Sequence, residues 1–152
     1  MFLTAREEYD FLFVDFYASW CSHCKALAPT WETLAEVMRI AAEDILLNNL
    51  HEEGHPDADK ITEEQLKEAH KVHLPVMIAK VDCVMHVELC KKQQIMGYPT
   101  LRLFVGGVAR SDYRGDREVI EMTHWLAQME EHEYGEKGAI HDTHNGTYVR
   151  WY

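Results

Sequence analysis

The sequence predicts an α/β domain in which a mixed central β-sheet is flanked by helices. The chain has 152 residues, of which 47% are hydrophobic, and this length suits one domain with a single core better than two. Apolar runs typical of strands alternate with helical periodicity, in the order strand, helix, insertion, strand, helix, strand, strand, helix. This order predicts one parallel pair of strands and a terminal antiparallel hairpin.

The first two predicted elements are a buried strand and a long helix. Residues 11–17 (FLFVDFY) form a continuous apolar run broken only by Asp15, a pattern typical of a strand buried on both faces. From Cys21 the apolar residues recur at steps of three or four, which predicts a helix. Its inward face comprises Leu27, Trp31, Leu34, Ala35, Met38 and Ala42.

Residues 43–74 are predicted to be an acidic, partly helical insertion between this helix and the next strand. They carry nine acidic residues against three lysines, which is typical of a solvated surface segment. Thr62 followed by Gln65 is a capping-box pattern, and it predicts a helix over residues 63–71.

Two histidine pairs in the insertion have the spacing of metal ligands on a helix. These pairs are His51 with His55 and His70 with His73, and the surrounding acids would add carboxylates. A solvated surface excursion explains them more simply, so we predict no metal site. We also predict no cofactor.

The second half of the chain is predicted to contain three strands and two helices. The strands cover residues 76–81, 101–105 and 108–113, and the helices cover 87–94 and 116–131. Gly106-Gly107 between the last two strands is a hairpin turn signal. The inward face of the last helix comprises Val119, Ile120, Thr123, Leu126 and Ala127. Residues 132–152 form a polar tail with three glycines, which we expect to be loosely ordered.

Composition and charge exclude several classes of function. The formal net charge is -11 at pH 7, which repels phosphate backbones, so we expect no nucleic-acid partner. No apolar run approaches the ~20 residues of a membrane span, so we expect none in this sequence. The chain opens almost directly on a core strand, with no signal peptide before it. We therefore expect a piece of a larger multi-domain protein whose targeting signals lie outside this sequence.

Cys21-Ser22-His23-Cys24 lies where the first strand gives way to the long helix. Free amide N–H groups and the macrodipole at the helix N-terminus favour a thiolate at Cys21. Cys24, one helical turn on, faces the same way and can attack a mixed disulfide formed at Cys21. The alternatives are a structural disulfide and a zinc half-site. Zinc needs four ligands, and the remaining two cysteines are separated by six intervening residues rather than two, so we interpret the motif as a redox site.

Four stretches of the sequence together resemble the thioredoxin superfamily, and within it the protein disulfide isomerase branch. They are VDFYASWCSHCKALAPTWE (14–32), IAKVDC (78–83), GYPTLRLF (97–104) and YRGDREVIEMTHWL (113–126). The resemblance implies a thioredoxin fold over residues 1–131, with the insertion at about 43–74 and the tail at 132–152. It also implies a thiol–disulfide oxidoreductase or isomerase that acts on cysteine-containing client proteins.

The same resemblance implies roles for three charged residues. Asp15 occupies the position of a buried acid six residues before Cys21, where isomerases usually carry Glu, and Lys80 matches its lysine partner. A charged Asp is costly to bury, so Asp15 is either ion-paired with Lys80 or, with a raised pKa, a proton acceptor for Cys24. Arg117 matches an arginine that approaches Cys24, and an ordinary solvated side chain is the alternative.

Four residues beside the cysteines complete the candidate site. Pro99 matches the family's cis-proline, with an ordinary trans turn as the alternative, and the backbone of Tyr98 would pair with an extended substrate. We assign Trp20, Tyr98 and Pro99 to substrate binding. The His23 imidazole is the isomerase-type choice between the cysteines, and we expect it to stabilise the Cys21 thiolate and make the site more oxidising. The alternative is an exposed spacer without electronic effect.

Cys83 and Cys90 flank a predicted strand–helix turn at a separation that permits a disulfide. A pair at this place resembles multi-domain thioredoxin-repeat proteins of the endoplasmic reticulum and quiescin-type sulfhydryl oxidases. The resemblance implies a structural disulfide and an oxidising compartment, the endoplasmic reticulum lumen or the secretory pathway. Two free core cysteines or a second redox pair are the alternatives. For the whole protein, the alternatives are a cytosolic thioredoxin-like disulfide reductase and a client-binding module whose cysteines matter little.

Overall fold

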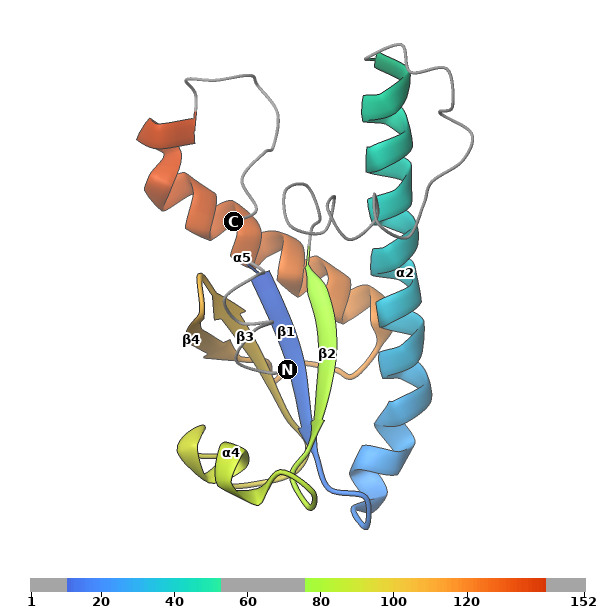
Figure 1. The fold of residues 1–152 in the computed structure, drawn as a ribbon, viewed down its shortest axis with the longest axis vertical. Helices are drawn as coiled ribbons and strands as arrows, with labels where there is room; N and C mark the ends of the chain where they lie inside the picture. The colour runs from blue at the N-terminus through green and yellow to red at the C-terminus, as the bar shows by residue number, and fades with distance from the viewer. Residues whose placement is uncertain (1–10, 53–75, 142–152) are drawn as a thin grey trace.

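The computed structural model describes residues 11–52 and 76–141 (Figure 1). Their elements follow in the order β1 (Phe11–Tyr17), α2 (Ser22–Glu52), β2 (Met77–Asp82), α4 (Val87–Lys92), β3 (Thr100–Val105), β4 (Val108–Asp112) and α5 (Val119–His141). The predicted α/β class, with a mixed sheet and flanking helices, is confirmed. The observed strands agree with the predicted ones to within one residue at each end, and α4 ends two residues earlier than expected.

The four described strands are arranged around β1. They pair in the order β2-β1-β3-β4, with β1 parallel to β2 and antiparallel to β3, and β3 antiparallel to β4. Gly106 and Gly107 make the β3–β4 turn with φ angles of 55° and 79°, values that glycine adopts without strain. Because β3 runs against β1 and β2, its start lies at the same edge as their carboxyl ends, the lower edge in Figure 1.

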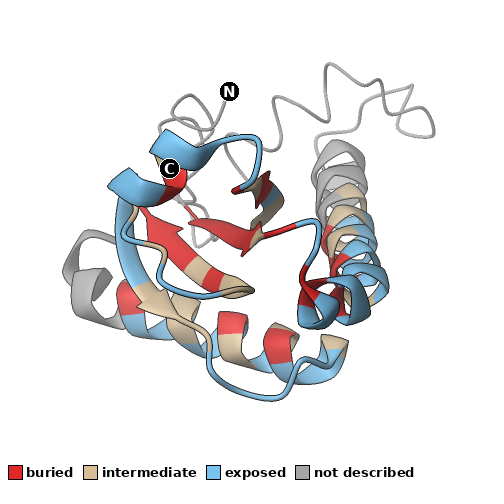
Figure 2. Cartoon of the chain, turned by 90° about the horizontal axis from the view of Figure 1, so that it is seen from below, coloured by how far each residue is buried: buried red, intermediate tan, exposed pale blue. Residues whose placement is uncertain are grey.

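Each face of β1 belongs to a different hydrophobic cluster. Phe13 packs in the cluster that includes residues of α2 and α5, whereas Leu12 and Val14 pack in the cluster that includes Cys90 of α4. Figure 2 shows buried residues along the strands and exposed residues on the outer faces of the helices. Because side chains alternate along a strand, Asp15 falls on the same face as Phe13, toward α2.

Helix α2 is longer than expected and extends into the segment predicted to be the insertion. The predicted inward residues Leu27, Trp31, Leu34 and Met38 are buried. The helix continues to Glu52 because residues 43–52 contain no Gly or Pro, and the first breaker is Gly54. The helix predicted over residues 63–71 and the candidate metal-ligand histidines His55, His70 and His73 lie outside the described residues.

Helix α5 corrects the expectation of a helix over 116–131 followed by a loosely ordered tail. It begins at Val119 and runs through His141, ten residues beyond the predicted end. Gly135 and Gly138 do not end the helix, because each glycine costs only ~1 kcal/mol relative to Ala in a helix interior. No helix in the described parts of the chain has the length and apolarity to span a membrane.

The inward face of α5 also differs from the prediction. Met122 and Leu126 are buried, whereas Ile120 is 66% exposed and Ala127 faces solvent. The buried row continues to Glu133, whose carboxylate accepts hydrogen bonds from Arg110 Nε and Nη2 at 2.5 and 2.8 Å. A buried carboxylate needs such a bidentate partner, and this pair therefore joins α5 to β4.

Candidate active site

Cys21 and Cys24 lie at the start of α2, at the edge of the sheet where β1 and β2 end (Figure 1). Cys21 directly precedes Ser22, the first helical residue. The backbone N–H of Cys24 donates to Cys21 Sγ, with nitrogen and sulfur 3.4 Å apart. The two residues are only 8% and 4% exposed. The helix N-terminus therefore presents an amide to the sulfur of Cys21, as the position of the motif predicts.

The surroundings of the two thiols push their pKa values apart. The pKa of Cys21 is lowered, chiefly because the Cys24 side chain and backbone amide donate hydrogen bonds to its sulfur. Burial raises the pKa of Cys24 to about 11, helped by its hydrogen bond to Cys21 and by the negative charges of Cys21 and Asp15. Cys21 is thus equipped as the nucleophile, whereas Cys24 needs a base before it can react.

His23 acts on Cys21 through its backbone. The His23 N–H is among the groups that lower the pKa of the Cys21 thiol, and the side chain is exposed to solvent. The expected effect of the imidazole on the thiolate stays a prediction.

Asp15 is the buried acid of the site. It is 4% exposed, and its Oδ1 has no hydrogen-bond partner among the described residues. Burial raises the pKa of Asp15 to about 7, opposed by the charges of Arg117 and Lys80. A cavity of about 90 Å³ is lined by both Asp15 and Cys24. This placement supports Asp15 as the proton acceptor for Cys24, since a base with a pKa near neutrality suits proton transfer at physiological pH.

The ion pair between Lys80 and Asp15, one of the two alternatives for this acid, is not formed. The two residues are register partners on β2 and β1, but the Lys80 ammonium lies 3.9 Å from Glu32 Oε1 instead. The Lys80 side chain is 58% exposed, because its long apolar stem lets the charged end reach solvent. Arg117, an exposed residue just before α5, contributes a positive charge that lowers the pKa of both Asp15 and Cys21.

Of the three residues assigned to substrate binding, Tyr98 contacts the Cys21 sulfur, and Pro99 and Trp20 adjoin Tyr98. The Tyr98–Pro99 peptide bond is cis, and the Tyr98 carbonyl oxygen lies 3.7 Å from Cys21 Sγ. The Trp20 ring, 68% exposed, packs edge-on against the Tyr98 ring with centroids 5.9 Å apart. An accessible backbone segment and an exposed aromatic side chain therefore lie directly beside the nucleophile.

Cys83 and Cys90 form a disulfide with a Cα–Cα distance of 5.7 Å. Both are buried in the cluster on the face of the sheet opposite α2. The Cys90 carbonyl accepts a hydrogen bond from the Ile95 amide at 3.0 Å, in the segment that leads to Tyr98. The disulfide therefore attaches α4, and the segment after α4, to the end of β2.

We expect replacement of both Cys83 and Cys90 by Ala to lower stability and leave turnover mostly intact. Closing a loop of about eight residues adds roughly 2–3 kcal/mol by restricting the unfolded chain, which corresponds to a melting temperature lower by about 5–10 °C in the variant. Thermal unfolding and insulin reduction measure the two effects. Equal melting temperatures for the variant and the oxidised wild type would contradict a structural role.

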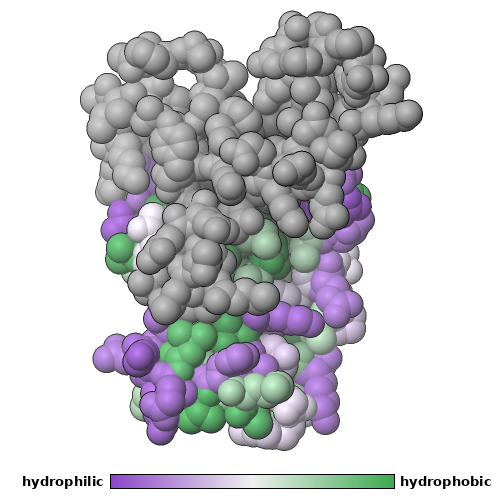
Figure 3. Space-filling view, in the orientation of Figure 1, coloured by the Kyte–Doolittle hydropathy of each residue, from purple (hydrophilic) through white to green (hydrophobic). Residues whose placement is uncertain are grey.

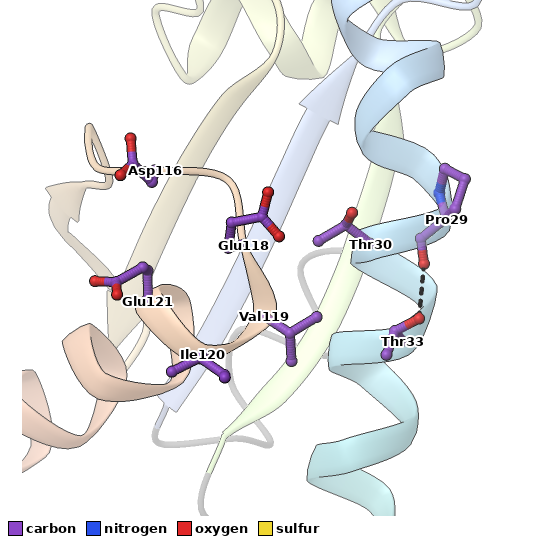
Figure 4. A pocket seen from close by; sticks show the side chains of 8 residues that line it. All are labelled: Pro29, Thr30, Thr33, Asp116, Glu118, Val119, Ile120 and Glu121. Atoms are coloured by element: carbon purple, nitrogen blue, oxygen red, sulfur yellow. Dashed lines mark hydrogen bonds between the residues drawn. The ribbon is translucent and has the colours of Figure 1, made fainter.

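A larger cleft of about 600 Å³ lies between α2 and the start of α5, away from the cysteines (Figure 4). Its walls carry Thr30 and three carboxylates, those of Asp116, Glu118 and Glu121. None of the predicted site residues lines it, and the described residues include no group of acids, histidines or cysteines arranged to hold a metal. Glu32 lines the cavity that contains Asp15 and Cys24. The sequence did not predict a role for Glu32, because no motif marks this residue.

Comparison with known proteins agrees with this geometry. The model of the Thioredoxin family matches residues 4–60 and 55–128. The thioredoxin domain-containing protein 5 homolog of Drosophila melanogaster is 32% identical over 139 residues, which cover 86% of this chain and 26% of that protein. Protein disulfide-isomerase 1 of Dictyostelium discoideum is 34% identical over 117 residues, covering 76% of this chain and 24% of the relative. The chain thus spans about a quarter of these relatives.

Solved structures show the same architecture. Human ERp44, crystal form I, superposes with a TM-score of 0.58 at 26% identity, covering 83% of this chain and 26% of that one. The J-Trx1 fragment of ERdj5 has a TM-score of 0.55 at 26% identity, covering 84% of this chain and 47% of the fragment. Together with the family match, these likenesses confirm the predicted thioredoxin fold.

Proposed function

This chain belongs to the thioredoxin family, and from that premise we propose that it is a thiol–disulfide oxidoreductase of the protein disulfide isomerase type. The observation that carries the proposal is the inequality of the two thiols, a nucleophilic Cys21 with a lowered pKa and a buried Cys24 whose pKa is about 11. A dithiol of this kind can attack a client's disulfide and then release the client. A client-binding module would not need this inequality.

The reaction follows from the positions of three residues. The Cys21 thiolate attacks one sulfur of a client disulfide, forms a mixed disulfide and expels the client's other sulfur as a thiolate. Asp15 takes the proton of Cys24, and the Cys24 thiolate then attacks Cys21 Sγ. The bond between Cys21 and the client breaks, the second client sulfur leaves as a thiolate, and the site holds a disulfide. The client has gained two electrons, and the reverse sequence oxidises a dithiol client.

Clients are proposed to be incompletely folded proteins that present hydrophobic segments. Beside the site, Met85 and Met96 are 77% and 94% exposed, and Trp20 is 68% exposed. Met85 follows β2, Met96 precedes β3 and Trp20 follows β1. All three therefore lie at the edge of the sheet that carries the cysteines. Figure 3 shows hydrophobic residues among hydrophilic ones at this lower end of the molecule. Flexible methionines suit varied apolar sequences.

The endoplasmic reticulum lumen is the proposed compartment, and a larger multi-domain protein the proposed context. The Cys83–Cys90 disulfide supports an oxidising environment, because such bonds are rare in the cytosol. The short span of the chain relative to its relatives supports the multi-domain context.

The redox potential of Cys21–Cys24 tests the proposal against the alternative of a thioredoxin-like reductase. The reduction potential of thioredoxin is about -270 mV, and that of protein disulfide isomerase is about -180 mV. Because hydrogen bonds to Cys21 stabilise its thiolate, we expect equilibration against glutathione buffers to give a value nearer the isomerase. A wild-type value at or below that of thioredoxin would favour the reductase.

His23→Pro should shift this potential down by tens of millivolts. Proline removes the backbone N–H that helps to lower the pKa of Cys21, and about 30 mV corresponds to 1.4 kcal/mol for this two-electron couple. His23→Ala is the matched control, because it keeps the amide and removes only the imidazole. An unchanged potential in His23→Pro would show that the amide does not stabilise the thiolate.

A further inference from the structure

Glu32 stands at the mouth of the cavity that contains the proton-transfer pair. The cavity is lined by Asp15 and Cys24 at its buried end, and by Glu32 and Lys80, whose side chains are 74% and 58% exposed. Its volume of about 90 Å³ exceeds the roughly 30 Å³ that one water molecule occupies in the liquid. The cavity thus connects the buried carboxyl with a surface pair of opposite charges.

A side-chain hydrogen bond between α2 and β2 holds Glu32 and Lys80 opposite each other. The Trp31 indole Nε1 donates a hydrogen bond to the Ala79 carbonyl oxygen at 3.1 Å. This bond joins the turn of α2 that carries Glu32 to the strand residue before Lys80. The Glu32 carboxylate therefore meets the Lys80 ammonium at 3.9 Å, although the register places Lys80 beside Asp15.

The charges around Asp15 come from several elements. Lys80 on β2 and Arg117 before α5 are positive, and both lower the pKa of Asp15. Cys24 on α2 lines the same cavity, and so does Tyr17 on β1, whose own pKa is raised partly by the Asp15 charge. Of the two cations, Lys80 has an acidic partner in Glu32.

We propose that Glu32 is a positioning residue for the Cys24 proton transfer, which holds the Lys80 ammonium at the cavity mouth and offsets its charge, so that Asp15 stays basic. The proposal rests on the proposed function and deepens it. The proton moves from Cys24 Sγ to the Asp15 carboxylate, and the sulfur keeps the electron pair with which it attacks Cys21. A fully effective Lys80 charge would make Asp15 a weaker base, because a nearby cation favours the ionised carboxylate.

The test is a pH titration of the Asp15 side-chain carboxyl, monitored by carbon-13 NMR in the protein with Cys21 and Cys24 reduced. Glu32→Gln should lower the Asp15 midpoint by roughly half a pH unit, which is the scale of an exposed ion pair. Glu36→Gln is the matched control, since Glu36 lies one turn along α2 and pairs with Arg39. It should leave the midpoint unchanged.

Double variants identify the route of the effect. In a Lys80→Met background, Glu32→Gln should no longer move the Asp15 midpoint, whereas in an Arg117→Gln background its effect should persist. The pH profile of Cys24 attack on a mixed disulfide of Cys21 with glutathione should shift to lower pH by the same amount in Glu32→Gln.

The titration separates this proposal from the proposed function. An unchanged or raised Asp15 midpoint in Glu32→Gln would overturn the role of Glu32. The role would also be overturned if Glu32→Gln lowered the Asp15 midpoint equally in the wild-type and Lys80→Met backgrounds. Because the NMR measurement needs no client, a protein inactive toward insulin that still shows the Lys80-dependent shift would overturn only the oxidoreductase function.

Discussion

Cys21→Ser will lose all disulfide reduction and isomerisation, whereas Cys24→Ser will lose turnover but accumulate mixed disulfides with clients. The difference follows from the two environments. Hydrogen bonds from Cys24 lower the pKa of Cys21 and leave it ready to attack, so its removal abolishes the first step. Without Cys24, the first step proceeds and the mixed disulfide has no internal thiol to resolve it.

Insulin reduction, refolding of scrambled ribonuclease and non-reducing gels with a cysteine-containing client measure these outcomes. Ser22→Ala is a suitable control, because Ser22 is an exposed residue between the cysteines and should leave activity intact. At pH 7, only about one Cys24 thiol in ten thousand ionises when its pKa is about 11, so iodoacetamide should label Cys21 first. Client capture by Cys21→Ser instead of Cys24→Ser would reverse the assignment.

The parts of the site that depend on local sequence were predictable. A buried strand, a short connection and a helix N-terminus fix the surroundings of Cys21, and the run FLFVDFY already shows that Asp15 is enclosed. The partner of Lys80 was not predictable, because a long charged side chain can reach several acids. Only the packing of Trp31 against β2 brings Glu32 within 3.9 Å of its ammonium.

The helix ends were predicted less well than the strands, and α5 shows why. Its residues beyond 131 look polar and contain glycines, which locally favour a loop. In the structure Glu133 lies inward on the same helical row as Met122 and Leu126, and Arg110 of β4 satisfies its carboxylate. A contact between residues so far apart in sequence does not appear in the local pattern.

Asp15→Asn should stabilise the protein at alkaline pH while slowing release of clients from Cys21. Burial raises the folded-state pKa of Asp15 to about 7, whereas an unfolded chain has an Asp pKa of about 3.9. Below about pH 4 the carboxyl is neutral in both states and costs nothing. As the pH rises, the unfolded chain releases the proton first, so wild-type stability falls until the pH passes about 7 and then levels off.

The difference of about 3 pKa units between the folded and unfolded states corresponds to roughly 4 kcal/mol of lost wild-type stability at high pH. Above about pH 8, Asp15→Asn should therefore be more stable than the wild type by this amount, and the gain should shrink progressively toward pH 4. Urea unfolding of both proteins with Cys21 and Cys24 reduced, at pH values from 4 to 9, measures this. Parallel stability curves would contradict a raised pKa for Asp15.

The same substitution removes the base for Cys24, so attack on the mixed disulfide should slow at pH 7 even though the protein is more stable. Opposite signs for stability and rate are expected of a buried acid kept for its chemistry rather than for folding.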